Sequence, residues 1–313
     1  MAIKKSINSV QIVGTLKEIN LSREGVAKRQ IGRKGSEKTV DCNRISKTEF
    51  KNPAFVIEVN GNPVEVDVSW GVDEKYIDKD GNVADNPKYK TLETILSTYV
   101  VGETRVKVDG SLAPNEYVTQ DGEWKEYVQK VELFTMTSTN VPSEDYAEGS
   151  ISGIIGGRTP IIVNEEETGK IKLAMQTFNY AGALVPMTFV VPADLADAFE
   201  DMYETNSQAK LDFAVVTVQH GAKTTEPTGF GRKSKRVAGY TTTEFQIIGG
   251  DEPFEEENEY FVNDDDRANA YEERQVMIAR RKADKGVKTA PTTVKGSANA
   301  AVGNPFGNIE SPF

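Results

Sequence analysis

Two short stretches of the chain concentrate positive charge and suit one kind of chemistry, the binding of phosphate groups. Residues 22–38 hold six Lys or Arg and two acids, and residues 223–236 hold five and one, so each carries a net charge of +4. Glycines in both stretches keep the backbone pliable. One such stretch is most often a solvated surface loop, but two of them at predicted binding loops favour a polyanionic partner.

Aromatic side chains near these cations could supply the flat surfaces on which unpaired bases stack. Residues 170–180 alternate as a strand with an inward apolar set, which leaves Lys170, Lys172, Phe178 and Tyr180 on the outer face. The alternative for these two aromatics is packing under a loop or between domains. The same alternation directs Arg105 and Lys107 outward from the strand that starts near residue 104.

Four further aromatics, two tyrosines and two tryptophans, receive different predictions. Tyr117 and Trp124 flank a turn at residues 120–123, where a hairpin projects into solvent, and both suit stacking. Tyr127 suits the core equally well. Trp70 continues an inward set of valines in residues 64–68, which favours a core position.

The residues required for catalysis are scarce. The chain has one histidine, His220, and one cysteine, Cys42, which excludes a multi-histidine metal site and an internal disulfide. No phosphate-binding Walker loop or G-x-S-x-G motif is present. The acidic run at residues 251–266 lacks the spacing of a calcium loop. We therefore expect no enzyme activity, no metal and no cofactor.

The net charge is unevenly distributed over the 313 residues. The chain carries −11, which by itself argues against a nucleic-acid partner. Residues 251–266 alone carry −9, because they hold nine acids and no base.

The longest apolar runs fall short of the ~18 residues that span a bilayer, and the N-terminus lacks the apolar region of a secretory signal. These features predict a cytoplasmic protein with no membrane and no small-molecule substrate.

The order of elements predicts a mainly β protein built from one plan used twice. Amphipathic helices are expected near residues 91–102 and 192–204, each with three strands before it and two after it. This is the order of the OB-fold, a Greek-key barrel, with one helix between strands three and four. We expect an OB domain at residues 1–142 with a long basic loop at 22–50, and a second OB domain at 143–250. Residues 251–313 form an acidic segment, a short helix starting near residue 267 and a flexible tail.

Two segments carry a resemblance to a known family. Residues 102–134 contain the run G-x-x-x-V-x-V-x-G-x-L, with Gly102, Val106, Val108, Gly110 and Leu112 at its fixed positions, followed by N-x-Y, a D-G turn and a tyrosine-bearing strand, and residues 6–20 contain a strand with Gly14 near its middle. Both resemble the OB-fold single-stranded DNA-binding proteins of bacteria and phages. The resemblance implies single-strand binding, and the apparent tandem domains fit a phage type.

The C-terminus adds to this resemblance. Proteins of that family commonly end in an acidic tail with a Pro-Phe tip that docks replication and repair enzymes, and this chain ends in Pro312-Phe313. The resemblance therefore implies partner docking through Pro312 and Phe313, with a solubility tail as the alternative. The acidic run at 251–266 could also compete with DNA for the basic loops.

The sequence thus predicts sequence-independent binding of single-stranded DNA during phage replication or recombination. RNA offers the same phosphates and bases, so it remains a possible partner. A virion or assembly protein that uses its barrels for protein contacts, and a strand-annealing factor, are the alternatives. The predicted nucleic-acid contacts are Lys28, Arg29, Arg33, Lys34, Lys38, Arg105, Lys107, Tyr117, Trp124, Lys170, Lys172, Phe178, Tyr180, Arg232, Lys233, Lys235 and Arg236.

Overall fold

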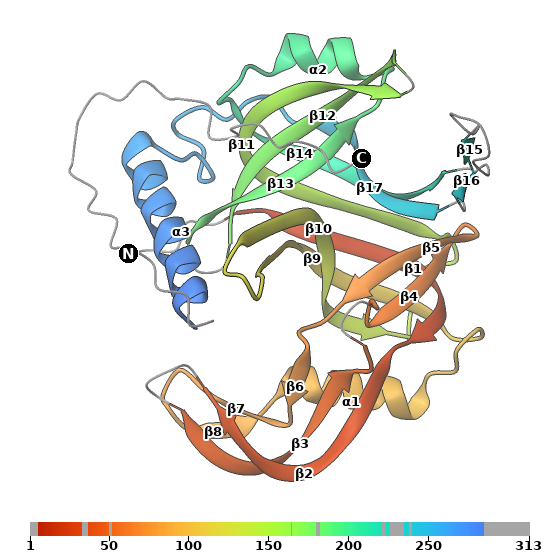
Figure 1. Cartoon of the computed structure of the whole chain (residues 1–313), viewed down its shortest axis with the longest axis vertical. Coiled ribbons are helices and arrows are strands. Elements are labelled where there is room, and N and C mark those ends of the chain that lie inside the picture. Colours follow the sequence, from red (N-terminus) through yellow and green to blue (C-terminus); the bar gives the residue numbers. More distant parts are fainter. Residues whose placement is uncertain are drawn as a thin grey trace.

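Figure 1 shows the fold of the 313-residue chain in a computed structural model. Structure is described for residues 6–32, 37–49, 52–163, 165–179, 182–220, 223–225, 235–237 and 240–284. Within these residues the chain is mainly β, as predicted, and ten strands join into one sheet.

Five strands of this sheet close into a barrel, the first ring. Their order is β1-β4-β5-β10-β9, and β9 pairs back to β1 to close the ring. The pairing of β10 with β5 is parallel and the other pairings are antiparallel, which is the arrangement of the OB-fold. The strands are β1 (Asn8–Ile19), β4 (Phe55–Val59), β5 (Asn62–Asp67), β9 (Arg105–Val118) and β10 (Trp124–Thr137).

The other five strands repeat the same order in a second ring. β11-β12-β13-β17-β14 follow one another, β14 pairs back to β11, and β13 pairs with β17 in parallel. These strands are β11 (Tyr146–Val163), β12 (Glu166–Phe178), β13 (Leu184–Val191), β14 (Gln208–His220) and β17 (Tyr240–Gly250).

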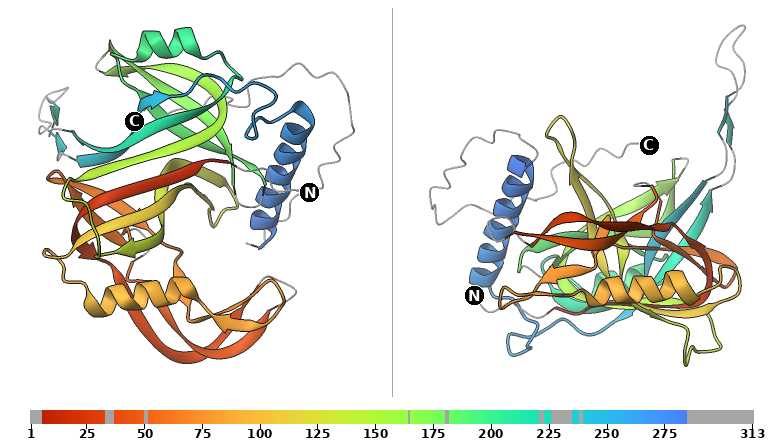
Figure 2. Two further views of the ribbon diagram at one scale, coloured as in Figure 1. Left: turned by 180° about the vertical axis from the view of Figure 1, so that it is seen from behind. Right: turned by 90° about the horizontal axis from the view of Figure 1, so that it is seen from below.

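The two rings share a seam. β1 pairs with β11 from Asn8–Ile151 to Val13–Tyr146, and one hydrophobic cluster includes residues from both rings. Figure 2 shows the rings stacked on this seam. Because of this shared core, the division into separate OB domains at residues 142 and 250 stays a prediction.

Glycine occupies the same position in the first strand of each ring. A β-carbon on Gly14 would lie 2.1 Å from the carbonyl oxygen of Glu58, and one on Gly153 would lie 2.1 Å from that of Gln176. Neighbouring backbone therefore passes too close for any side chain, which explains the glycine that the sequence places in the middle of β1.

The first two helices overlap the ranges that the apolar spacing predicts, although α1 starts and ends four residues earlier than expected. α1 (Pro87–Thr98) follows β5 and precedes β9, and α2 (Ala196–Met202) lies between β13 and β14. α1 starts at the capping residue Asn86, whose side chain accepts a hydrogen bond from the Lys88 amide, and it buries Leu92 and Ile95. α3 (Asp264–Asp284) begins three residues before the predicted start.

The predicted basic loop at residues 22–50 is largely a β-structure. β2 (Leu21–Ile31) and β3 (Lys38–Lys47) form a hairpin, and β6 (Gly71–Asp73) extends it into a three-stranded sheet that we call the arm. The arm projects below the first ring beside α1 (Figure 1). Two small ribbons complete the fold: β7 (Lys75–Ile77) with β8 (Val83–Asp85), and β15 (Lys223–Thr225) with β16 (Lys235–Val237).

Candidate nucleic-acid interface

A groove of about 450 Å³ opens on the first ring, at the base of the arm. One wall comes from the end of β3 and the chain that follows β5, and the other comes from the β9–β10 hairpin. Exposed aromatics and lysines gather in it. Its lining includes Lys47, Glu65, Asp67, Trp70, Asn115, Tyr117, Tyr127 and Lys130.

Tyr117 and Tyr127 form a flat pair on one wall. In the β9–β10 register Tyr117 lies opposite Lys125 and Tyr127 lies opposite Asn115, so both tyrosines emerge on one face of the hairpin. Their rings stack at a centroid distance of 5.6 Å and an interplanar angle of 10°, and their hydroxyls lie 3.1 Å apart. This hydrogen bond raises the pKa of Tyr117. Tyr117 is 39% exposed and Tyr127 54% exposed, which leaves ring surface for a ligand.

Trp70 stands on the opposite wall, and the prediction that it is a core residue is wrong. It is 48% exposed, and its carbonyl accepts a hydrogen bond from the Lys47 amide at 3.0 Å. β5 ends at Asp67, and Val68 is the last buried residue before the chain turns into β6. The inward alternation therefore stops before it reaches Trp70.

A carboxylate between two lysines lies on the floor of the groove. Asp67 accepts hydrogen bonds from the Lys47 ammonium at 2.8 Å and the Lys130 ammonium at 2.6 Å. Burial by itself would raise the pKa of Asp67, but the bonds from Lys130 and Lys47 outweigh it, so the pKa lies below its ordinary value. Lys47 is 7% exposed and Lys130 reaches solvent, so Lys130 is the cation that a ligand can meet.

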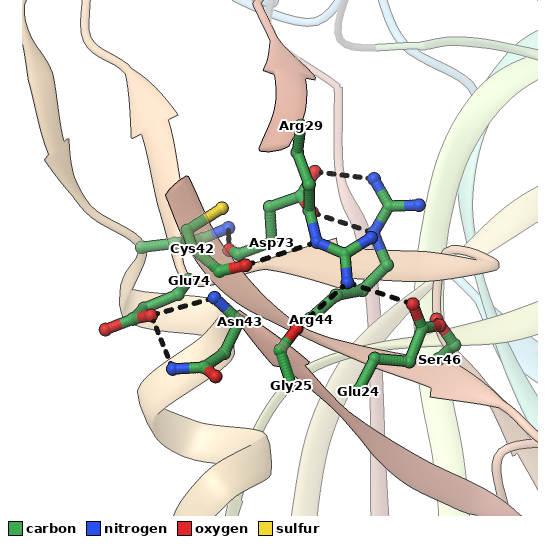
Figure 3. A network of polar contacts seen from close by, with 10 residues as sticks. Glu24, Gly25, Arg29, Cys42, Asn43, Arg44, Ser46, Asp73 and Glu74 are labelled. Carbon is green, nitrogen blue, oxygen red and sulfur yellow. Dashed lines mark hydrogen bonds and ion pairs between the residues drawn. The ribbon is translucent and has the colours of Figure 1, made fainter. Parts of the chain in front are cut away.

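The arm uses part of its positive charge internally (Figure 3). Arg29 donates to Glu24 at 3.0 Å and to the Cys42 carbonyl at 3.3 Å, and it lies 3.6 Å from Asp73. Asp73 also binds Arg44. Arg29 is therefore held in a network rather than presented as the predicted phosphate contact. Cys42 is buried beside it.

The other predicted cations of the arm differ from one another. Lys28 is exposed on β2, with no hydrogen bond or ion pair in the described part of the chain, and it suits a phosphate. Lys38 is exposed, but its ammonium donates to the Gly81 carbonyl at 2.6 Å. Arg33 and Lys34 lie outside the described residues.

Arg105 and Lys107 point outward as predicted, but the groove lining does not include them. Arg105 donates to the carbonyls of Pro142 and Ser143, both at 2.9 Å, and pairs with Asp145 at 2.6 Å. It thus fastens the segment that connects the rings. Lys107 lies 3.8 Å from Asp109, so its charge is partly offset.

The second ring presents fewer of its predicted contacts. Phe178 is not on an exposed face: it is buried with Ile154 and Leu184 against Val262 and Ala270 of the C-terminal segment. Lys170 lies 3.9 Å from Glu244, and Lys172 is exposed without a partner among the described residues. The backbones of Lys235 and Arg236 lie in β16. Tyr180, Arg232, Lys233, Pro312 and Phe313 lie outside the described residues, as do the side chains of Lys235 and Arg236.

Trp124 is near the hairpin turn, as predicted, but it faces away from the groove. Its indole nitrogen donates to Glu126 at 2.8 Å. The guanidinium carbons of Arg274 and Arg281, both on α3, lie 5.4 and 5.6 Å from the ring centroid. Trp124 is thus covered on one side by a cation–π contact rather than open for stacking.

The groove residues that the sequence prediction missed are Lys47, Trp70, Tyr127 and Lys130. Tyr127 could have been found, since the turn at Asp121-Gly122 fixes a register that places it beside Tyr117. Lys130 and Lys47 come together only through Asp67, which no local pattern in the sequence indicates.

Neither a metal centre nor a membrane span is found in the described part of the chain. No three His, Cys, Asp or Glu side chains among the described residues are placed to hold a metal ion. None of the helices in the described ranges has the length and apolar character that a bilayer crossing requires.

Comparison with solved structures gives distant matches. A deletion mutant of the single-stranded DNA binding protein from Thermus aquaticus has 10% identity and a TM-score of 0.45, over 81% of this chain and 98% of that one. The wild-type Thermus aquaticus protein has 10% identity and a TM-score of 0.41, over 81% and 96%. A Replication Protein A heterotrimer bound to ssDNA has 9% identity and a TM-score of 0.17, over 79% and 50%. Because these TM-scores are below 0.5, they support no conclusion about this chain.

Sequence comparison gives one family. No curated protein sequence matches the chain. The YorF family model matches residues 6–284, which is most of the 313 residues. The chain therefore belongs to the YorF family.

Proposed function

We propose that the chain binds single-stranded DNA without sequence preference, through the groove of the first ring. The observation that carries the proposal is the gathering of Trp70, Tyr117 and Tyr127, all exposed, with Lys130 on the face of a barrel that has the OB-fold strand order. Non-specific binding of single strands needs aromatic faces for the bases and cations that follow the backbone.

The groove suits unpaired bases better than a duplex. Every base has a flat face that can stack on the tyrosine pair or on Trp70, and in a duplex that face is covered by the neighbouring base pairs. Lys130 and, on the arm, Lys28 supply the charge for the phosphates. Because stacking does not depend on base identity, binding should tolerate any sequence, and RNA binding is an outcome of the same test.

The direct test measures binding of a fluorescently labelled oligo-dT by anisotropy at two salt concentrations. Tyr127→Ala should weaken binding by about five- to a hundredfold, the value of one stacked base. Tyr271→Ala is the matched control, because Tyr271 is a similarly exposed tyrosine on α3 outside the groove. Equal affinity of the wild type and Tyr127→Ala would contradict the proposed site.

The biological setting of this activity is proposed from the sequence resemblance. We place it in phage DNA replication or recombination, with Pro312 and Phe313 recruiting partner proteins. A pull-down of replication proteins from infected cells, with and without the last ten residues, tests this setting. Equal recovery by both chains would rule out the recruiting role of the C-terminus.

A protein-contact function is the second candidate, and a separate surface favours it. A hollow of about 550 Å³ lies over the seam between the rings, lined by the exposed apolar residues Phe134 and Ile248 and by Asp109, Glu148 and Asp212. Exposed apolar side chains with an acidic surround suit a protein partner rather than DNA. Two results together would favour this candidate: the wild type does not bind oligo-dT, and the Phe134→Ser variant no longer binds a protein that the wild type binds.

A further inference from the structure

The outer part of the β9–β10 hairpin leaves the barrel and lacks other strand partners. β9 pairs with β1 through residues 105–110, and β10 pairs with β5 at residues 131 and 132. Within the described sheet, the paired residues of 113–127 pair only with the facing strand of the same hairpin. A two-stranded hairpin by itself is marginally stable in water, so this part needs support from elsewhere.

The two faces of this outer hairpin differ. Residues paired directly across an antiparallel ladder emerge on the same face. Tyr117 and Tyr127 occupy the face that lines the groove, whereas Glu116, Trp124 and Glu126 occupy the opposite face. The groove face carries the proposed stacking surface, and the opposite face is covered by α3.

α3 grips the opposite face through one buried arginine. The two terminal nitrogens of Arg274 bind both carboxylate oxygens of Glu116, one at 2.8 Å, and Arg274 also binds Glu126 at 3.0 Å. The side chains of Arg274 and Glu116 are 6% and 2% exposed. The Arg274 guanidinium also covers the Trp124 ring, and Arg281 adds a contact with Glu116 at 3.5 Å.

The first half of α3 is fixed to the second ring. Arg267 donates to the Asn206 side chain at 2.9 Å, and just before the helix the Gln208 side chain of β14 exchanges two hydrogen bonds of 2.7 Å with the Val262 backbone. α3 therefore crosses from one ring to the hairpin of the other, as Figures 1 and 2 show. Apolar contacts also hold this end of α3 on the second ring: Val262 and Ala270 pack with Ile154, Phe178 and Leu184.

We infer that Arg274 is a positioning residue: α3 braces the back of the hairpin through Arg274 and so holds Tyr117 and Tyr127 in the groove. This inference rests on the proposed function. A binding surface that is already ordered loses less conformational freedom when the ligand arrives, so the brace raises affinity without touching the ligand. Loss of the Arg274 contacts should therefore make the hairpin that carries Tyr117 and Tyr127 mobile without unfolding the barrel.

The test uses two substitutions that separate positioning from direct contact. Arg274→Met leaves the buried Glu116 carboxylate with only the longer 3.5 Å contact to Arg281, which disfavours docking of α3. Adding Glu116→Met replaces the ion pair by apolar side chains of similar volume, an exchange that is often neutral or stabilising. Arg280→Met is the matched control, since it removes the same charge from an exposed position of the same helix.

Three properties are measured for each full-length variant. Anisotropy with labelled oligo-dT gives the affinity, and hydrogen exchange of residues 113–127 without DNA gives the order of the hairpin. The third is the emission of Trp124 in a Trp70→Phe background, which leaves Trp124 as the one tryptophan and reports docking of α3.

We expect Arg274→Met to speed exchange in the hairpin, shift the Trp124 emission and weaken binding at least about fivefold, the lower value of one stacked base. The double substitution should restore exchange and affinity to within about twofold of the wild type, and Arg280→Met should bind within about twofold. Hairpin exchange unchanged by Arg274→Met would overturn the inference. An Arg274→Met variant with wild-type affinity, or a double variant as weak as the single one, would also overturn it.

Failure of the wild type to bind would instead refute the proposed function, and hairpin exchange would still decide whether α3 acts as a brace.

Discussion

Asp67→Asn should lower the stability of the protein and at the same time strengthen its binding to single strands. Asp67 accepts from the ammonium groups of Lys47 and Lys130 and from the Val68 amide at 2.9 Å. The asparagine keeps the shape of the side chain and removes its charge. Lys130 can then turn to water, but Lys47 is buried and stays beside a neutral amide.

The magnitude follows from the burial of Lys47. Breaking a buried ion pair by removing one partner costs about 3–5 kcal/mol, and the remaining amide oxygen recovers part of that, so we expect a loss of about 2–4 kcal/mol. For a chain of this size, that corresponds to a decrease in Tm of about 3–7 °C. Glu58→Gln is the matched control, because the Lys17–Glu58 pair spans 3.1 Å between exposed side chains and should cost under about 1 kcal/mol.

The pH dependence of this loss has a definite sign. The pKa of Asp67 is lower in the folded protein than in the unfolded chain, so its charge stabilises the fold above the unfolded pKa. That contribution disappears as the pH falls through the folded pKa. The difference in unfolding free energy between wild type and Asp67→Asn should therefore be full at pH 7 and shrink under strongly acidic conditions.

Two assays on the same samples test the predicted loss of stability and gain of affinity in Asp67→Asn. Urea unfolding followed by circular dichroism gives the stability, and oligo-dT anisotropy across a salt series gives the affinity. Removal of the carboxylate should tighten binding at low salt and steepen the salt dependence by up to about one charge. A variant as stable as the Glu58→Gln control, or one that binds more weakly than the wild type while still folded, would refute this account of the groove floor.

The remaining predictions concern Glu65 and Gly14. Glu65 belongs to the groove lining, where desolvation of its carboxylate, together with the Asp67 charge, raises its pKa. Single-strand binding should therefore tighten as the pH falls from neutral through the raised pKa, and Glu65→Gln should remove that dependence in anisotropy titrations. Gly14→Ala should destabilise the chain by more than about 2 kcal/mol in urea unfolding, since its β-carbon would meet the Glu58 carbonyl at 2.1 Å. Gly157→Ala, with nothing within 4 Å of the added carbon, should stay within about 0.5 kcal/mol, and an equal effect of the two would contradict the close approach.

The strands of the barrel could be predicted because each has one buried face. β1, β4 and β9 alternate between buried and more exposed residues, and this two-residue period is present in the sequence. β2 could not be predicted in the same way. Nearly every residue between Leu21 and Ile31 is exposed, so no alternation marks the strand and the basic composition suggested a loop.

The site was predicted in part, and its errors have two physical causes. Trp70 was placed by extending an alternation past the end of β5, although periodicity holds only while the strand lasts. Phe178 was assigned to the outer face of its strand and Trp124 to a hairpin turn that projects into solvent, but α3 packs against both. That helix lies about 90 and 150 residues further along the chain, and no local pattern indicates where a distant element will pack. Arg105 also faces outward, but it is paired with Asp145, which is likewise distant in sequence.

The central claim, that the groove of the first ring binds single strands, has one most direct measurement. The chain holds two tryptophans, and Trp124→Phe leaves Trp70 on the groove wall as the one reporter. Titration of this variant with oligo-dT should quench its fluorescence, and the affinity should fall steeply between low and moderate salt. A fluorescence unchanged by saturating oligo-dT at low salt, in a folded protein, would contradict the account.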